Sequence, residues 1–201
     1  YAGLASQLKA GSYLVPAKSS PKDIADIITR GGASTCGTEI VYRIGVTQLS
    51  NLVRELDPAT STYIEKAKFD PAAEEAPAEY LAVRDRIDTR FRIAVAEGVT
   101  SWQIVEGLKR ISLLEGDIAD VPAEGSLAPQ SYEVKKGDKR EELLIEMTDR
   151  QEAILAQAWE NRVDGLPLNS PEEALILASL IEKGTGVAEE RRQVASVVVN
   201  R

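Results

Sequence analysis

Carboxylates are the side chains of this sequence best placed for acid–base chemistry. The 201 residues contain no histidine, which excludes Ser-His-Asp and Cys-His catalysis and most zinc sites. Acid–base chemistry then falls to carboxylates, Lys or Tyr, and we expect neither a metal nor a cofactor. Three glutamates, Glu182, Glu189 and Glu190, surround the stretch "KGTG", in which Gly184 and Gly186 interrupt an apolar, helix-like run.

Composition and charge narrow the class of protein. A hydrophobic content of 43% is enough for one sizeable core or two small ones. The formal net charge of −8 argues against a nucleic-acid partner, because binding to phosphates requires clustered Lys and Arg. The glycine-rich stretch around Cys36, "GGASTCG", lacks the Lys and the spacing of a P-loop, so we interpret its cysteine as an ordinary loop thiol.

The two ends of the sequence give a further expectation. No run of about 18 apolar residues occurs, and the start lacks the pattern of a signal peptide, so these residues alone predict a soluble protein. The chain does not begin with Met and ends in the apolar run "VASVVVNR". We therefore expect a fragment of a longer protein.

Three helix starts follow from capping patterns. The pairs are Ser20 with Pro21, Thr100 with Gln103, and Ser170 with Glu173. Gly31 is expected to end the first helix. The third helix, which starts after Ser170, is apolar at nearly every position over residues 174–181 and should be buried on more than one side. Residues 138–162 predict a long amphipathic helix with a solvated charged face.

Strand-like patterns are fewer. Residues 11–17, 38–46 and 89–98 are β-branched or alternating runs bounded by turn residues. Residues 57–88 are rich in Ala, Pro and acidic residues and suggest a helical or partly flexible excursion. Trp102 and Trp159 follow helical apolar spacing and are expected in the core.

Because the sequence predicts both helices and strands, the expected fold class is α+β.

Six segments, in one order over most of the chain, carry a family resemblance. They are "LKAGSYLV", the capped helix after it, "AEGVTSWQIVEGL", "EGSLAPQSY", "AWENRVDGLPLNSPEEALILASLIEK" and "GVAEERRQVASVVVNR". Together they resemble the YceG-like family of endolytic murein transglycosylases. The resemblance implies three parts: a small LysM-like N-terminal subdomain (1–46), an acidic Ala/Pro-rich insertion (47–90), and a mainly helical part of a mixed α/β catalytic domain (91–201), truncated at its C-terminus.

The resemblance also implies a biological setting. It indicates a bacterial enzyme with its body in the periplasm, held to the inner membrane by one N-terminal helix absent from this chain. Such an enzyme cleaves glycan strands of nascent peptidoglycan between N-acetylmuramic acid and N-acetylglucosamine, without water, and leaves 1,6-anhydro ends. Peptidoglycan strands are the expected substrate, and peptidoglycan synthases are possible partners.

The family's catalytic motif resembles Ser-Ile-Ile-Glu-Lys-Glu-Thr, with the second glutamate assigned as the acid. The corresponding stretch here is residues 179–185, which places Gly184 at the catalytic position. One carboxyl suffices for this reaction because it first protonates the glycosidic oxygen and then takes the proton of the sugar's C6 hydroxyl. An acid at position 184 would be partly desolvated among apolar neighbours, whereas Glu182 is rotated by roughly 200°.

Several explanations of Gly184 stay open. The chain is an engineered inactive variant, a natural member that has lost catalysis, or an active enzyme in which Glu182 or Glu189 has taken over. Alternatively, Gly184 and Gly186 simply end the helix. If the acid is missing, the chain is impaired or inactive as an enzyme.

The resemblance suggests weaker substrate-binding candidates. Glu124 and Tyr132 belong to a pattern "EG-x-x-x-P-x-x-Y" and could line the glycan groove, although a buried core tyrosine is the alternative. Thr185 follows the catalytic position, and Glu190 matches an "x-E-R" stretch that could equally be a surface charge pair. Gln130 departs from the acidic residue that the family usually has.

Two other functions compete with the enzyme. One is a non-catalytic peptidoglycan-binding or scaffold module that positions synthesis or division partners. The other disregards the resemblance and takes the chain as a helical cytoplasmic adaptor.

Overall fold

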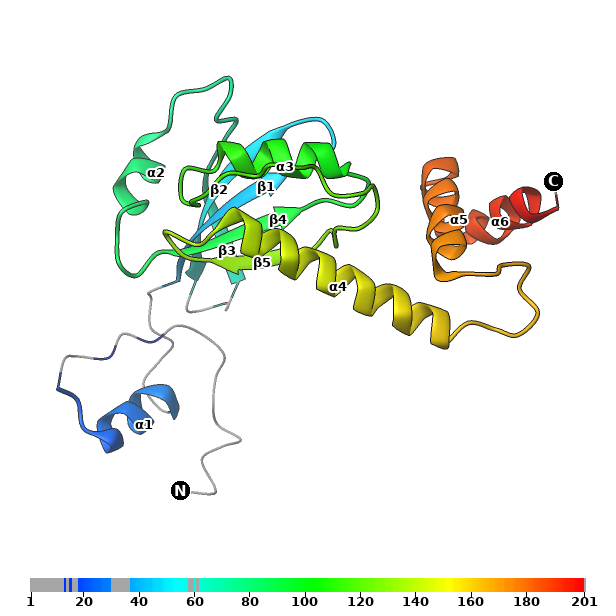
Figure 1. The fold of residues 1–201 in the computed structure, drawn as a ribbon. Helices are drawn as coiled ribbons and strands as arrows, with labels where there is room; N and C mark the ends of the chain where they lie inside the picture. Colours follow the sequence, from blue (N-terminus) through cyan, green and yellow to red (C-terminus); the bar gives the residue numbers. More distant parts are fainter. Residues whose placement is uncertain are drawn as a thin grey trace. The chain divides into compact units, whose positions relative to one another are not determined.

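A computed structural model describes residues 13, 15, 18–29, 37–57, 60 and 62–200. Its elements in chain order are α1 (Pro21–Thr29), β1 (Thr38–Ile44), β2 (Leu49–Asp57), β3 (Thr62–Phe69), α2 (Ala78–Val83), β4 (Arg90–Val95), α3 (Ser101–Arg110), β5 (Ser131–Val134), α4 (Arg140–Glu160), α5 (Pro171–Gly184), a 3-10 turn (Ala188–Glu190) and α6 (Arg191–Val199). The chain forms two compact units (Figure 1). The expected α+β class is confirmed.

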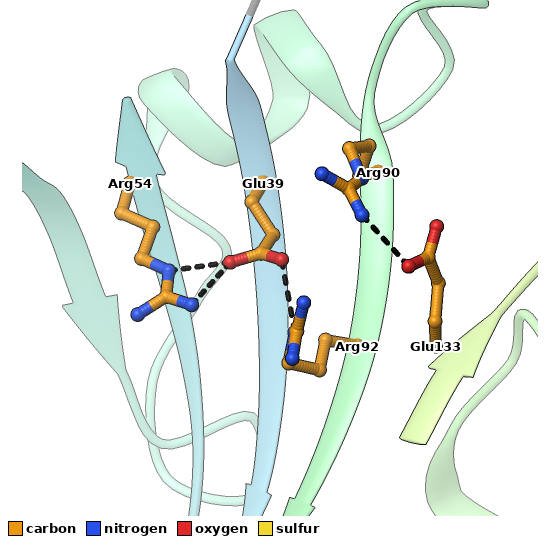
Figure 2. A network of polar contacts seen from close by, with 5 residues as sticks. All are labelled: Glu39, Arg54, Arg90, Arg92 and Glu133. Carbon is orange, nitrogen blue, oxygen red and sulfur yellow. Dashed lines mark hydrogen bonds and ion pairs between the residues drawn. The ribbon is translucent and has the colours of Figure 1, made fainter. Parts of the chain in front are cut away.

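The first unit, residues 1–94 with 131–135, contains a five-stranded sheet in the order β3-β2-β1-β4-β5. Pairs β1–β2, β2–β3 and β4–β5 are antiparallel. The strands that carry Glu39 and Arg92 run the same way in Figure 2, so the sheet is mixed. The expected strands at 38–46 and 89–98 are confirmed as β1 and β4.

Side chains on one face of this sheet form its core. Ile40 on β1 lies opposite Val53 on β2, and Ile93 on β4 lies opposite Tyr132 on β5. All four are almost completely buried. The alternation of β-branched residues in these strands therefore places one set of side chains out of water, and this burial stabilises the sheet.

A tyrosine pair links the sheet to α2. The Tyr42 and Tyr80 hydroxyls lie 3.3 Å apart, and the Phe69 ring meets the Tyr80 ring edge-on with centroids 5.1 Å apart. Burial raises the pKa of the Tyr42 phenol, with the Tyr80 hydroxyl as a further cause. The Tyr42 hydroxyl thus stays neutral, and the two hydroxyls satisfy one another in an apolar setting.

The segment expected as a helical or partly flexible excursion differs from that expectation. Residues 62–69 form β3, and helix is limited to α2. β3 is exposed at most positions, so its sequence lacks the apolar alternation that predicts a strand. Its pairing with β2 supplies the hydrogen bonds that local sequence does not reveal. The proposed domain boundaries at 46 and 90 remain predictions.

The second unit, residues 95–130 and 136–201, is mainly helical. Arg140, the first residue of α4, donates hydrogen bonds to the carbonyl oxygens of Leu108 (2.9 Å), Ile111 (2.8 Å) and Gly116 (2.6 Å). Two of these carbonyls belong to the end of α3, where carbonyls lack helical partners. One guanidinium therefore joins the end of α3 to the start of α4.

The predicted helix caps are largely confirmed. Thr100 and Gln103 form a reciprocal capping box at α3, and the Ser20 hydroxyl accepts a hydrogen bond from the Asp23 backbone N–H at α1. The Ser170 hydroxyl caps α5, but the Glu173 carboxylate reaches the backbone N–H of Asn169 instead of that of Ser170. The long amphipathic helix is confirmed as α4.

Two of the sequence predictions concern residues 11–17 and 31–36, most or all of which lie outside the described residues. Tyr13 and Val15, the described members of the first range, are not in a strand. The expected helix stop at Gly31 and the thiol of Cys36 are outside the description. In the described part of the chain, no helix is long and apolar enough to cross a membrane.

The polar face of the sheet holds a buried carboxylate. Glu39 on β1 has only 1% of its side chain exposed and lies between Arg54 on β2 and Arg92 on β4 (Figure 2). Arg92 Nε donates to it at 3.0 Å, and Arg54 donates from the other side. The neighbouring pair, Arg90 with Glu133 at 2.7 Å, is far more exposed. Hydrogen bonding from Arg90 lowers the pKa of Glu133.

We expect Glu39→Gln to lower the free energy of unfolding by about 1–3 kcal/mol, because two charge-assisted hydrogen bonds are lost inside the protein. Glu133→Gln is the matched control, and its exposed pair should contribute no more than about 1 kcal/mol. Urea unfolding followed by circular dichroism compares the two. Equal losses in the two variants would contradict the assignment of Glu39 as the stabilising carboxylate.

Candidate functional site

Gly184 is the last residue of α5, and its backbone does not require glycine. The helix is ended by Thr185, whose extended backbone follows the last turn and whose N–H donates to the Ile181 carbonyl at 3.1 Å. Gly184 and Gly186 are not among the residues with positive φ. A left-handed helix stop therefore does not explain either glycine.

The position of Gly184 is constrained by α6 instead. A Cβ atom added at residue 184 would lie 3.0 Å from Val194 Cγ1, so Val194 would have to move by a few tenths of an ångström. At Gly186 an added Cβ would meet nothing within 4 Å. The glycine at 184 thus permits a close approach of α5 and α6, which the sequence analysis did not detect.

Thr185 and Glu190, two predicted substrate-binding residues, are brought together. The Thr185 hydroxyl donates to Glu190 Oε2 at 2.8 Å and accepts from the Val187 backbone N–H at 3.0 Å. Thr185 is buried, whereas Glu190 is exposed. The threonine therefore fixes the turn between α5 and α6 and holds one carboxylate beside position 184.

Of the two alternative acids, one is in an ion pair and the other is exposed to solvent. Glu182 Oε2 accepts a hydrogen bond from Arg191 at 3.2 Å, and both side chains are half exposed. Glu189 is exposed. Neither glutamate therefore lies in the desolvated setting that favours a general acid.

The expectation that α5 is buried on more than one side is wrong. None of its residues is buried, and Ile176 and Leu180 expose 60% and 49% of their surface. A helix that is apolar on several sides needs several partners. In the described part of the chain, α5 contacts α4, α6 and the turn at Gly125. Desolvation at position 184 is accordingly weaker than expected.

Glu124 lies in a turn between α3 and β5 in the chain, and this turn contacts both α3 and α5. Its carboxylate accepts from the Ser101 backbone N–H at 3.0 Å, and the Ser101 hydroxyl donates to the Ala123 carbonyl at 2.9 Å. A carboxylate at a helix N-terminus satisfies a free N–H and complements the helix dipole. Glu124 thus anchors the start of α3, whether or not it also contacts substrate.

Gly125 in the same turn does require glycine. Its φ is +80°, and the Ser126 N–H closes the turn onto the Ala123 carbonyl at 3.1 Å. An added Cβ would also lie 3.1 Å from Leu175 Cδ2 on α5. The turn therefore brings the Glu124 motif against the helix that carries position 184.

The other predicted residues lie elsewhere. Tyr132 is 1% exposed on β5, which favours the core interpretation over stacking on a sugar. Gln130 accepts a hydrogen bond from Arg150 at 3.2 Å. No group of three or more potential metal-ligating residues occurs within the described residues.

The expectation that both tryptophans lie in the core is wrong for Trp102, which is 61% exposed. The capping box sets the register of α3, so Ile104, Val105 and Leu108 face inward and Trp102 lies on the outer side. Trp159 is half-buried with the Arg162 guanidinium 3.9 Å above its ring. Periodicity alone did not reveal the exposure of Trp102.

Comparison with known proteins identifies the class. The family model of the YceG-like family matches residues 1–201. The chain therefore belongs to the YceG-like family, whose known activity is lytic transglycosylation and whose substrate is peptidoglycan. A search of curated proteins found no match.

Gly125→Ala should destabilise the protein more than Gly165→Ala. Both glycines have φ near +80°, so each substitution carries a backbone cost of about 1–2 kcal/mol, but only residue 125 has a neighbour within 4 Å. Urea unfolding of both variants measures the difference. Equal destabilisation would show that the Leu175 contact adjusts freely.

Gly184→Ala should stabilise the protein by about 1 kcal/mol through its higher helix propensity. Part or all of this gain should be lost because the added methyl group crowds Val194. In a Val194→Ala background that loss should disappear. We expect a coupling of at least about 0.5 kcal/mol in a double-mutant cycle of unfolding free energies. Additive effects of the two substitutions would contradict the close approach of α5 and α6.

Proposed function

We propose that this chain has the architecture of an endolytic lytic transglycosylase and is impaired in cleavage because residue 184 has no side chain. The proposal is supported by the family match along the chain and by Gly184 at the catalytic position of the motif. The second observation carries the proposal, because Glu182 is paired with Arg191 and Glu189 is exposed.

The reaction would balance without water. An acid protonates the glycosidic oxygen between N-acetylmuramic acid and N-acetylglucosamine, and the bond from C1 to that oxygen breaks. The C6 hydroxyl oxygen then bonds to C1, and the carboxylate takes its proton, which restores the acid and leaves a 1,6-anhydro end. Unlike ordinary glycoside hydrolysis, this reaction needs a single carboxyl, so loss of one residue removes the whole proton path.

The surroundings of residue 184 support its assignment as the missing acid. A side chain there would start against Val194, an apolar neighbour that would partly desolvate a carboxyl and raise its pKa. The hydroxyl of Thr185 holds Glu190 at the next turn. Glu182 is turned toward Arg191, with which it forms an ion pair at 3.2 Å.

The proposed setting is the periplasmic face of the bacterial inner membrane, with peptidoglycan synthases as partners. This part of the proposal follows from the family alone.

A second function, a non-catalytic peptidoglycan-binding or scaffold module, is favoured by one observation. Residue 184 can neither donate nor accept a proton, while the turn at residues 123–126 contacts both α3 and α5. A chain that binds glycan strands without cutting them would use the same surface.

The test is mass spectrometry of soluble products after incubation with uncrosslinked nascent glycan strands. We expect anhydro-ended products from Gly184→Glu, also when Val194→Ala is added to relieve the close contact, and none from the parent chain. Gly186→Glu is the matched control, because it adds a carboxyl two residues away in open space.

Each outcome separates the alternatives. Products from the parent chain would move the chemistry to another residue. Products from Gly186→Glu as well would show that position 184 is not special. If folded Gly184→Glu variants give no product, the non-catalytic binding module is the function that remains.

A further inference from the structure

The outer side of α3 carries an aromatic residue and an ion pair in one row. Trp102, Glu106 and Lys109 are spaced i, i+4 and i+7 and therefore share a face of the helix. Trp102 is 61% exposed, and Lys109 Nζ lies 3.0 Å from Glu106 Oε1. The opposite side, with Ile104 and Leu108, is buried.

Trp102 differs from the other aromatic residues that the structure describes. Its ring has no aromatic or cationic neighbour and its indole N–H has no hydrogen-bond partner among the described residues. The others are buried, half-buried or covered by an arginine: Tyr13, Tyr42, Tyr63, Phe69, Tyr80, Phe91, Tyr132 and Trp159. Trp102 therefore presents an apolar ring and an indole N–H without a partner among the described residues to solvent on the outer side of α3.

The backbone under Trp102 is held rigidly. The capping box at Thr100 fixes the first turn of α3, and the Ser101 backbone N–H and hydroxyl are both bound by the turn at Ala123 and Glu124. A ring on a preorganised element loses little entropy when a ligand binds. The same turn approaches α5 at Leu175, nine residues or about 13 Å along the helix from Gly184.

We propose that Trp102, Glu106 and Lys109 form a glycan-binding subsite, separate from residue 184, for the sugar rings of a β-1,4-linked amino-sugar strand. The C–H face of a pyranose ring would cover the indole, as an apolar group covers an aromatic face. The charged pair and the indole N–H would exchange hydrogen bonds with hydroxyl and N-acetyl groups. The choice of ligand rests on the proposed function.

The test uses the chain with Gly184 intact and a defined probe, the β-1,4-linked tetramer of N-acetylglucosamine. In a Trp159→Phe background the fluorescence of Trp102 should shift to shorter wavelength as the tetramer is added. Titration calorimetry should then show affinity weakened roughly tenfold by Trp102→Ala and less by Trp102→Phe. Ile145→Ala, an exposed apolar residue on α4, is the matched control and should bind normally.

Unchanged affinity in a folded Trp102→Ala variant would overturn the proposal. A fluorescence shift with phosphatidylglycerol vesicles and none with the tetramer would also overturn it and assign the residue to a membrane surface. Binding is measured without catalysis, so a failure of the subsite proposal can be told apart from a failure of the cleavage proposal. Absence of products from Gly184→Glu leaves the subsite standing.

Discussion

The turn at residues 123–126 is the constraint on which the candidate site depends. Its Gly125 adopts a conformation that a side chain would strain, and this allows the backbone to pass close to Leu175 on α5. The carboxylate of Glu124 satisfies the first N–H of α3 from the same turn. Both helices that carry candidate functional positions, Trp102 on α3 and Gly184 on α5, are therefore positioned by four residues that contain no regular structure of their own.

Electrostatics play a comparable role in the sheet. Glu39 is buried between arginines from the strands on either side of β1, and its two oxygens are used in opposite directions. A slip of one residue would turn the carboxylate to the apolar face, where a charge without partners is costly. We infer that this arrangement selects the register of β1 between β2 and β4, a specificity role that buried charged groups have in some proteins.

The helix that carries residue 184 provides a position but little of the environment that the chemistry needs. A general acid requires a carboxyl and a setting of low polarity. Residue 184 lacks the first, and the exposure of α5 weakens the second. Val194 is the neighbour outside α5 that an added Cβ atom would meet within 4 Å. In the functions that we propose, binding of glycan and cleavage of glycan are separable, with different residues responsible for each.

Local sequence determined much of this protein. The starts of α1, α3 and α5 follow from Ser20, Thr100 and Ser170, because a cap is a hydrogen bond between residues three apart, and the α+β class follows from periodicity. The resemblance of residues 179–185 to the family's motif predicts that Gly184 stands at the catalytic position. Only the tertiary structure decided that β3 is a strand, that Trp102 faces solvent, that α5 is exposed and that Gly184 approaches Val194. Each of these depends on which distant segment packs against which, and that information is not contained in spacing along one segment.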